Sequence, residues 1–446
     1  MRLDRAALHA SVSDPCLESM NFLNEITMRY PDAISFGPGR PYDGFYEIAD
    51  IRRNLDAYVT HLREAEGREE RAIVRALFQY GATAGQIREL VARMLRRDEG
   101  IDVDPAALVV TVGCQEAMLI VLRALFADPD QVLLVTEPCY VGIVGAARLL
   151  GLEVVGVREA GGGPDPADLA AKLAALRARG KRARAFYVNP DFANPSGLTM
   201  SVEERRALLD AAEAEELVLL EDNAYGLFTA PGTRLPTLKS LDTGGRVVYL
   251  GSFSKSAFPG VRVGFAIADQ PVDGPGGTGL LADELSKIKS MVTVNTPALC
   301  QAVVGGLLVR HADNIEAANA KSIGWYETNR ATLLDALAEA FPEEAGWAAE
   351  VRWNRPRGGF FLTVDVPFAA DAEALAVSAG THGVIWTPMS SFYLGAGGER
   401  QLRLSYSYLT PDQIREGVHR LAGFVRDRIE GGAGAARPLS TAAIAE

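Results

Sequence analysis

The middle of the chain alternates short apolar runs with segments that carry apolar residues at helical spacing. The apolar runs cover residues 108–112, 132–136, 153–157, 185–188, 217–220, 247–250 and 263–267. Strands that alternate with helices in this way are typical of a mostly parallel sheet covered by helices on both faces. The pattern therefore predicts a large α/β domain with a seven-stranded, mostly parallel sheet.

Helical segments in the same region carry recognisable signals. Residues 84–95 are predicted to form an amphipathic helix. Its apolar positions are Ile87, Leu90, Val91, Met94 and Leu95. A helix is also predicted over 167–179, and another over 202–216, where Ser201 precedes the first turn and Glu204 follows three residues later. Ser and Glu at that spacing form a capping box, which fixes the start of the helix.

The N-terminal part of the chain, residues 1–45, is predicted to form an arm that also contributes to the small domain. A short helical pattern covers 17–30 and is followed by the loop Phe36-Gly-Pro-Gly-Arg-Pro41. Two prolines and two glycines exclude regular structure from this loop. A helical stretch then begins the large domain, which is predicted to cover 46–310.

The C-terminal part is predicted to form a smaller α+β domain over 311–430. After a long, interrupted helical region, strands are expected at 360–364, 383–386 and 401–405 and a final helix at 411–428. The last stretch, 431–446, is rich in Gly, Ala and Ser and is predicted to be disordered.

Composition and charge limit the classes of partner. The chain has 446 residues, of which 48% are hydrophobic, enough for a sizeable core and two domains. A net charge of -12 argues against nucleic acid or an anionic membrane as a partner. No apolar run approaches the roughly 18 residues that span a bilayer, and residues 1–14 carry charges where a signal peptide would be apolar. We therefore expect a soluble, cytoplasmic protein.

Cysteine and histidine residues are dispersed along the chain. The cysteines are Cys16, Cys114, Cys139 and Cys300, and the histidines are His9, His61, His311, His382 and His419. No CxxC or HExxH spacing occurs, so the sequence indicates neither a disulfide framework nor a metal site.

Candidate chemistry is concentrated in residues 251–265. Lys255 follows Ser252 and Ser254, and Arg262 comes seven positions later, just before an apolar strand. A lysine amine can form a Schiff base with an aldehyde, while serine hydroxyls and an arginine are good phosphate ligands. The combination indicates pyridoxal 5′-phosphate. The alternative is a surface turn with two ordinary cations.

Polar residues also follow other predicted strands, at the edge where open α/β sheets bind ligands. Asp222 could pair with a protonated pyridine nitrogen and Tyr225 could reach the ring hydroxyl, although Asp222 could instead cap a helix. Asn194 lies in a proline-rich turn and is suited to donate to a phenolate oxygen. Tyr140 could stack on an aromatic ring or simply pack.

The turn at Gly113 joins a predicted strand to a helix. The backbone N–H groups of Cys114 and Gln115 would then point at a bound anion, and we expect that anion to be a cofactor phosphate. A glycine turn alone is a weak signal.

Two arginines outside the large sheet are candidate substrate contacts. Arg403 lies in an alternating strand, and its guanidinium fork matches a substrate carboxylate, with a structural salt bridge as the alternative. Gly39 and Arg40 lie on the 36–41 loop. A cation there would favour an acidic or phenolic substrate side chain, and the alternative is a solvated loop arginine.

The ordered set of motifs resembles the class I/II aminotransferases of PLP fold type I, over about residues 30–425. The matching motifs are Ser-Phe-Ser-Lys255, Arg262, Asp222 with Tyr225, Asn194-Pro-Ser-Gly, Gly113-Cys-Gln and Leu-Arg403-Leu. The resemblance implies that Lys255 is the Schiff-base lysine and proton shuttle, that Asp222 pairs with the pyridinium, and that Arg403 takes the α-carboxylate.

The remaining roles also follow from the resemblance. Asn194 and Tyr225 would hold the ring oxygen, and Tyr140 would stack on the ring. The residues around the phosphate would be Gly113, Cys114, Gln115, Ser252, Ser254 and Arg262. Cys114 departs from the small or hydroxyl residue usual in the family, so only its backbone role is carried over.

Two further motifs narrow the resemblance. Gln79-Tyr80-Gly81 and Tyr140-Val-Gly resemble the branch with 2-aminoadipate and kynurenine aminotransferases, which implies a homodimer in which Tyr80 reaches the neighbouring subunit's cofactor phosphate. The run at 14–25 and the 36–41 loop are similar to actinobacterial secondary-metabolism aminotransferases such as those making arylglycines. Arg40 is a departure, because related sequences often carry an apolar residue there.

The implied reaction is the transfer of an amino group between an L-amino acid, aromatic, arylglycine-like or acidic, and a 2-oxo acid by a ping-pong mechanism. Elimination, cyclisation or oxidation of an amino acid remains an alternative, because the same lysine can shuttle protons for these reactions. A non-enzymatic sensor is a second alternative, although no basic helix-turn-helix segment precedes Met20 and the chain is acidic.

Overall fold

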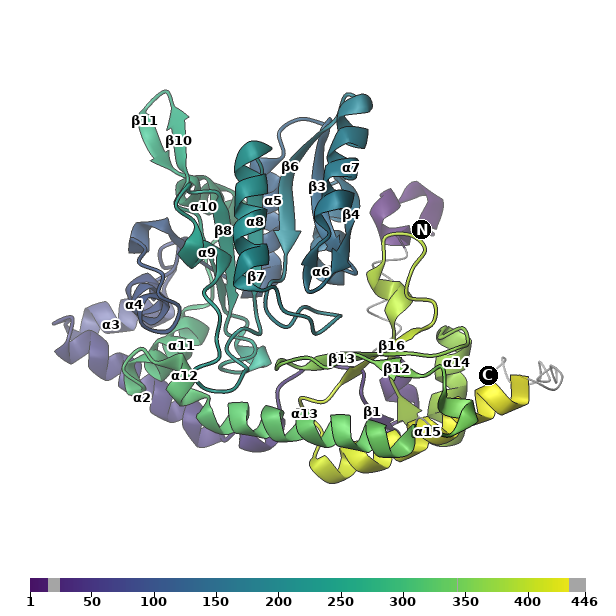
Figure 1. The fold of residues 1–446 in the computed structure, drawn as a ribbon. Coiled ribbons are helices and arrows are strands. Elements are labelled where there is room, and N and C mark those ends of the chain that lie inside the picture. Colours follow the sequence, from purple (N-terminus) through teal and green to yellow (C-terminus); the bar gives the residue numbers. More distant parts are fainter. Residues whose placement is uncertain (15–24, 343, 433–446) are drawn as a thin grey trace.

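The computed structural model describes residues 1–14, 25–342 and 344–432 (Figure 1). It consists of a unit built on a large sheet and a smaller unit built on a second sheet, joined along one side by long helices. Of the predicted helix at 17–30, residues 25–29 are helical and residues 17–24 lie outside the described residues, as do residues 433–446 of the predicted tail.

The large sheet has eight strands in the order β2-β9-β8-β7-β6-β3-β4-β5. They are β2 (Leu108–Thr111), β3 (Gln131–Glu137), β4 (Glu153–Ala160), β5 (Gly163–Pro164), β6 (Arg182–Val188), β7 (Val218–Asn223), β8 (Val247–Ser252) and β9 (Gly264–Ile267). β9 is antiparallel to both neighbours and β5 is antiparallel to β4, whereas the five central strands are parallel. The predicted α/β class is confirmed, with one added edge strand whose two residues form no apolar run.

Helices cover both faces of this sheet, as the unbroken apolar strands predict. One layer contains α5 (Gly113–Leu125), α6 (Val141–Leu149) and α10 (Leu281–Val292), and the other contains α7 (Pro166–Ala178), α8 (Val202–Ala214) and the short α9 (Leu238–Leu241). Side chains alternate along β3: Leu133 and Val135 pack in the first layer, Val132 and Leu134 in the second. The capping box of Ser201 and Glu204 is present at the start of α8.

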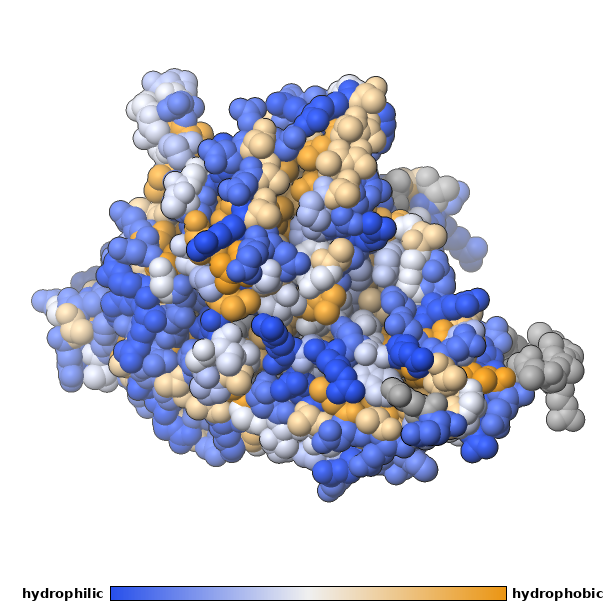
Figure 2. Space-filling view, viewed as in Figure 1, coloured by the Kyte–Doolittle hydropathy of each residue, from blue (hydrophilic) through white to orange (hydrophobic). Residues whose placement is uncertain are grey.

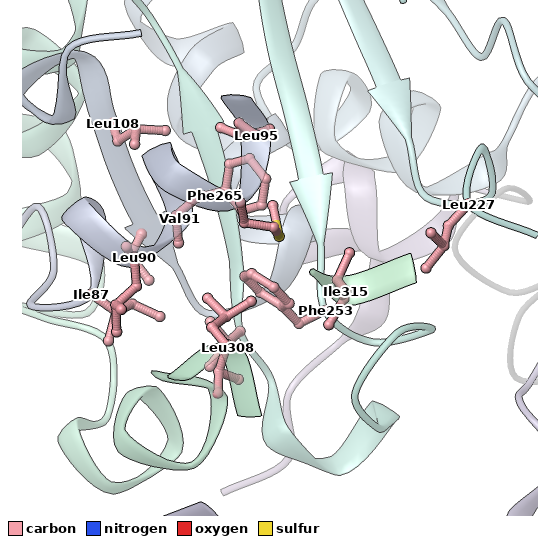
Figure 3. Close-up of a cluster of buried hydrophobic side chains, with 14 of the residues drawn as sticks. Ile87, Leu90, Val91, Leu95, Leu108, Leu227, Phe253, Phe265, Leu308 and Ile315 are labelled. Atoms are coloured by element: carbon pink, nitrogen blue, oxygen red, sulfur yellow. The ribbon is translucent and has the colours of Figure 1, made fainter. Parts of the chain in front are cut away.

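A third helical layer packs against β2 and β9. It contains α2 (Ile48–Glu64), α3 (Glu70–Phe78), α4 (Arg88–Asp98) and α11 (Ala298–Arg310). α4 starts four residues later than predicted from residues 84–95, because the Ala84 carbonyl accepts a hydrogen bond from the Val110 N–H and Gly85 has a positive φ of 100°. In Figure 3, Phe253 from the loop after β8 lies among the side chains of this core.

The smaller unit has an antiparallel sheet in the order β12-β13-β16-β15. Its strands are β12 (Arg352–Trp353), β13 (Phe361–Asp365), β15 (Thr387–Pro388) and β16 (Gln401–Ser405). The arm strand β1 (Ile34–Ser35) pairs with β14 (Val384–Ile385) beside it. The helices are α14 (Ala372–Val377) and α15 (Pro411–Gly432).

Two short elements, α12 (Ile315–Ala318) and the hairpin of β10 (Pro271–Gly274) with β11 (Gly277–Leu280), complete the fold; the hairpin projects from the large unit (Figure 1). The long helix α13 (Ala320–Ala340) spans both units, with Ile323 in the core of the large unit and Leu333 in the core of the small one. The predicted domain boundary at residue 310 therefore stays a prediction.

Hydrophilic residues dominate the face shown in Figure 2, with hydrophobic residues in scattered patches. In the part of the chain that the structure describes, no helix is both long and apolar enough to cross a bilayer.

Candidate active site

A cavity of about 740 Å³ lies at the C-terminal ends of the central strands, between the large sheet and the small unit. Most of the predicted site residues line it, namely Gly39, Arg40, Cys114, Gln115, Tyr140, Asn194, Asp222, Tyr225, Ser252, Ser254, Lys255, Arg262 and Arg403. The fold thus brings together residues that are spread over more than 360 positions of the sequence.

One end of the cavity is formed by the start of α5 and by Arg262. Arg262 donates from Nη1 to the Ser254 hydroxyl at 3.2 Å. Gly113, the first residue of α5, has a φ of 72°, and a Cβ there would lie 2.3 Å from Arg262 Nη2. A Cβ at Gly264 would lie 2.7 Å from the backbone nitrogen of Cys114. The two glycines therefore let the arginine and the N–H groups of a helix start approach closely, which makes an anion site.

Asp222, near the end of β7, lines the same cavity. Asp222 is 5% exposed and lies within the strand, so it does not cap a helix. Its Oδ2 accepts a hydrogen bond from the Tyr187 hydroxyl at 2.7 Å, and its Oδ1 lies 3.8 Å from the Cys114 Sγ. Burial raises the pKa of Asp222 to about 6, against the lowering effects of Tyr187, Cys114 and Lys255.

Lys255 extends across the cavity toward the arm. Its Nζ donates a hydrogen bond to the Gly39 carbonyl at 2.8 Å and lies 6.0 Å from the centre of the Tyr225 ring. Burial, followed by the positive charges of Arg262 and Arg403, lowers the pKa of Lys255 to about 8. The amine therefore loses its proton far more readily than an ordinary lysine, which favours a nucleophilic and basic role. Lys255 is therefore not an ordinary cation on a surface turn, which was the alternative, because its amine lies in the cavity.

Local sequence explains why the Lys255 loop takes this form. Phe253 is 2% exposed and packs in the core between the sheet and α11, as Figure 3 shows, so it anchors the loop. Its neighbours Ser252 and Ser254 line the cavity. The alternation of serine, phenylalanine and serine thus continues the two-sided pattern of β8 past its end.

Arg403 is buried between two aromatic rings. Its Cζ lies 4.5 Å from the centre of the Phe361 ring and 4.8 Å from that of Phe392. The guanidinium donates to Asn194 Oδ1 at 2.7 Å, to the Gly37 carbonyl at 2.7 Å and to the Thr387 hydroxyl at 3.2 Å.

No carboxylate within the described residues pairs with Arg403, and its Nε has no hydrogen-bond partner there. Burial lowers the pKa of this guanidinium to about 10. The salt-bridge alternative therefore finds no support, and the buried cation is suited to receive an anionic group.

Arg40 lies at the mouth of the cavity on the arm. Its side chain stacks on the Tyr408 ring, with Cζ 4.5 Å from the ring centre. The Arg40 carbonyl accepts from the Ser407 hydroxyl at 2.6 Å, which fixes the backbone of the loop. Gly39 is equally constrained, because a Cβ there would lie 2.2 Å from the Phe361 ring.

Tyr80 is the predicted site residue that lies away from this cavity. It is 84% exposed and lines a separate groove on the surface with Arg71 and Arg75. The sequence did not identify Phe361 and Phe392, which line the cavity, or Tyr187, which donates a hydrogen bond to Asp222. For Tyr187 a signal existed, since a tyrosine inside an apolar strand needs a partner for its hydroxyl.

These residues fit pyridoxal 5′-phosphate. Arg262, two serines and the start of α5 could hold its phosphate, and the buried Asp222 carboxylate on the same cavity could pair with a cationic ring nitrogen. Lys255, with its lowered pKa, lies on the same cavity. In the described part of the chain, no group of His, Cys, Asp and Glu side chains could hold a metal ion.

Comparison with known proteins agrees with this chemistry. A family model described as aminotransferase class I and II matches residues 52–421. The (S)-3,5-dihydroxyphenylglycine transaminase of Amycolatopsis orientalis is 49% identical over 428 residues, which cover 96% of each chain. The 2-aminoadipate transaminase of Thermus thermophilus is 33% identical over 405 residues, 90% of this chain and 91% of the relative.

A solved structure is also similar over nearly the whole chain. The kynurenine aminotransferase of Pyrococcus horikoshii, solved with PMP, superposes with a TM-score of 0.77 and 27% identity, covering 98% of this chain and 96% of that one. The matches favour transamination over elimination, cyclisation, oxidation or a sensor role. The chain belongs to the class I and II aminotransferases of fold type I, and it is a pyridoxal-phosphate-dependent enzyme that transfers amino groups of amino acids.

Proposed function

We propose that this aminotransferase acts on arylglycines with a hydroxylated ring, and on the corresponding 2-oxo acids. The observation that carries the proposal is Arg40, a cation on the substrate side of the cavity with no ion-pair partner within the described residues. A guanidinium there can donate a hydrogen bond to a phenolic oxygen of the substrate. The 49% identity with a protein named for 3,5-dihydroxyphenylglycine supports the same substrate class.

We propose the following roles for the residues around the cofactor. Bound pyridoxal phosphate supplies an electron sink for the charge left when a proton leaves the substrate Cα. Lys255 would hold the cofactor through its aldehyde and would move the proton at the substrate Cα. Its position at 2.8 Å from the Gly39 carbonyl and its lowered pKa support both roles.

The other cofactor contacts follow from their places on the cavity. Arg262, Ser252, Ser254 and the N–H groups of Cys114 and Gln115 would hold the phosphate. Asp222 would pair with the ring nitrogen, Asn194 and Tyr225 would hold the ring oxygen, and Tyr140 would stack on the ring. Each of these residues lines the cavity, which supports the set.

Arg403 would bind the substrate α-carboxylate. Its guanidinium lies close to two aromatic rings, and its hydrogen bonds to Asn194 and Thr387 fix its orientation. A free Nε–H next to an already oriented Nη leaves one edge of the fork for a carboxylate.

We propose that the enzyme is a homodimer with shared sites and that Tyr80 completes the partner's phosphate site. Exposed large apolar side chains support a contact surface, since Phe78 is 73% exposed, Met291 85% and Leu299 50%. Cys114 and Cys300 form no disulfide within the described residues, which supports a cytoplasmic location.

The substrate proposal is tested in the amino-donor half-reaction. Holoenzyme is mixed with (S)-3,5-dihydroxyphenylglycine, phenylglycine, phenylalanine or 2-aminoadipate, and conversion to pyridoxamine phosphate is followed by absorbance. The dihydroxylated donor is expected to have the highest kcat/KM. A higher value for unsubstituted phenylglycine or for 2-aminoadipate would contradict the proposal.

Arg40→Leu tests the residue that carries the proposal. We expect the preference for the dihydroxylated over the unsubstituted arylglycine to fall about tenfold, the value of one charge-assisted hydrogen bond. Arg400→Leu, at an exposed position before β16, is the matched control. An unchanged preference in Arg40→Leu would mean that Arg40 is a solvated loop residue.

The dimer proposal is tested by mixing two inactive variants, Lys255→Ala and Tyr80→Ala. If Tyr80 acts on the partner's site, a mixed dimer contains one site with both native residues, and activity should reappear on subunit exchange. Activity that stays absent, although light scattering shows mixed dimers, would place Tyr80 outside the neighbouring site.

A further inference from the structure

Asp222 is held from two sides by side chains that none of the recognised motifs explains. The Tyr187 hydroxyl, from β6, donates to Oδ2 at 2.7 Å, and the Cys114 thiol, in the first turn of α5, lies 3.8 Å from Oδ1. Tyr187 is 2% exposed and Asp222 5%, so bulk water cannot replace the hydroxyl. Three elements of the large unit thus converge on one carboxylate.

The backbone of the same strand end is fixed separately. Asn189 donates from Nδ2 to the Asp222 carbonyl at 2.5 Å, and its Oδ1 accepts from the Asn194 N–H at 3.2 Å. Because Asn189 holds the main chain, the contacts of Tyr187 and Cys114 remain to set the orientation and charge of the side chain.

We propose that Tyr187 and Cys114 are positioning residues that keep the Asp222 carboxylate ionised and aimed at the cofactor ring nitrogen. The proposal rests on the role proposed above for Asp222. An ionised carboxylate has about four acceptor positions, so each oxygen can accept from the chain and still accept from a ring N–H.

The physical need for two donors comes from burial. Removing a carboxylate from water disfavours its charged form, and burial raises the pKa of Asp222 to about 6. The titratable groups that face it are Lys255, Tyr140, Tyr225 and the two donors. Burial raises the pKa of Tyr140 to about 12 and that of Tyr225 further, so neither competes as an anion.

Cys114 fits the same need. Burial, followed by the negative charge of Asp222, raises the pKa of its thiol well above the usual value, so the sulfur keeps its proton and remains a donor. This explains a cysteine at a position where only the backbone would otherwise matter. A thiol is a weak donor, so its contribution should be smaller than that of the tyrosine hydroxyl.

The test uses the holoenzyme of Tyr187→Phe, which keeps the ring and removes one oxygen. Two quantities are measured: the apparent pKa of the bound cofactor's absorption band, and the cofactor dissociation constant by equilibrium dialysis. We expect the band to titrate about one pH unit away from the native value and the dissociation constant to rise about tenfold. For Cys114→Ala we expect a smaller shift of the band in the same direction and a cofactor dissociation constant about threefold above the native value.

The matched control is Tyr249→Phe on the neighbouring strand β8. Tyr249 is also 2% exposed and stacks on Phe265, and the groups that act on its hydroxyl are Glu99, Glu221, Arg234 and Asn223. The cofactor absorption band of Tyr249→Phe should titrate as it does in the native enzyme. Asp222→Asn is the reference variant, and we expect it to shift the titration of the cofactor band more than Tyr187→Phe or Cys114→Ala does.

The possible outcomes distinguish the positioning role of Tyr187 and Cys114 from the role of Asp222 itself. If Asp222→Asn shifts the band while Tyr187→Phe and Cys114→Ala titrate as native, the positioning role is overturned and the proposed role of Asp222 stands. If Asp222→Asn also leaves the band unchanged, the proposed cofactor contact fails as well. Should Tyr187→Phe fail to fold, Cys114→Ala, which leaves the sheet intact, decides the question.

Discussion

The two walls of the cavity are built in different ways. The cofactor wall consists of residues at or just after the C-terminal ends of β2, β3, β6, β7 and β8 of the large sheet, namely Cys114, Tyr140, Asn194, Asp222 and Lys255. The substrate wall consists of residues from the arm and the small unit, namely Gly39, Arg40, Phe361, Phe392 and Arg403. One wall is a continuous hydrogen-bonded sheet edge, whereas the other is assembled from segments that the chain brings together from both ends.

Few hydrogen bonds join the walls. Lys255 Nζ donates to the Gly39 carbonyl, and Arg403 donates to Asn194. The Cys139 N–H donates to the Phe392 carbonyl at 2.8 Å, and the Leu394 N–H to Glu137. Since the sheet fixes one wall and these contacts position the other, changes in the cofactor wall should alter cofactor chemistry, and changes in the substrate wall should alter KM and selectivity.

The largest effect is expected for Lys255→Ala in the cofactor wall. The variant loses both the covalent attachment point and the proton carrier, so turnover should fall by about 10⁴-fold or more. Single-turnover absorbance measures this loss. Lys239→Ala, which breaks an ion pair with Asp269 away from the cavity, is the control. Substantial turnover by Lys255→Ala would overturn the assignment of the cofactor wall.

Arg403→Lys should give the largest effect in the substrate wall. A lysine keeps the charge but loses the planar fork that is stacked between Phe361 and Phe392. We expect kcat/KM to fall about 100-fold, with the cofactor dissociation constant unchanged. Arg400→Lys is the matched control on the exposed turn nearby. Loss of cofactor binding in Arg403→Lys would show that the walls are not separable.

The same contrast explains what the sequence could predict. Asp222, Asn194 and Lys255 follow apolar runs, and parallel strands bring their C-terminal ends to one edge, so their convergence follows from pattern alone. Of the strands in the large sheet, only β5, an edge strand of two residues, was not predicted. The other seven strands could be predicted because each contains an apolar run.

The substrate wall could not be predicted in this way. β1 and β14 have two residues each, and no periodicity reveals their pairing. Phe392 reaches Arg403 because its loop binds to Glu137, 257 positions before Leu394 in the chain. Tyr187 differs, since its place inside an apolar strand indicates that its hydroxyl needs a partner but does not identify Asp222 as that partner. Tyr80 stays a prediction, because its role depends on a second subunit.

Gly39→Ala tests the packing of the substrate wall. The new Cβ would lie 2.2 Å from the Phe361 ring, and that ring must move away from Arg403. We expect KM for the amino donor to rise about tenfold while cofactor affinity stays constant. Gly145→Ala in α6, with no atom within 4 Å of its Cβ, is the control and should stabilise its helix by ~1 kcal/mol. An unchanged KM would mean that Phe361 does not position Arg403.

The smallest effect concerns the contact that joins the walls. Glu137 Oε1 accepts the Leu394 N–H at 2.6 Å, and a Cβ at Gly156 would lie 2.5 Å from Oε2, so the carboxylate is closely packed against β4. Glu137→Ala leaves the amide unpaired and loosens the loop that places Phe392 on Arg403. We expect KM to rise about threefold to tenfold, with kcat less affected.

Glu137→Gln is the matched control for that contact, because its amide oxygen can still accept the Leu394 N–H. It should lie close to the native enzyme, since only the charge is lost and the acceptor remains. If Glu137→Ala changed cofactor affinity instead of KM, the 389–394 loop would belong to the cofactor wall. If both variants matched the native enzyme in KM and affinity, the loop would hold its place without Glu137, and the Cys139–Phe392 hydrogen bond would be sufficient to join the walls.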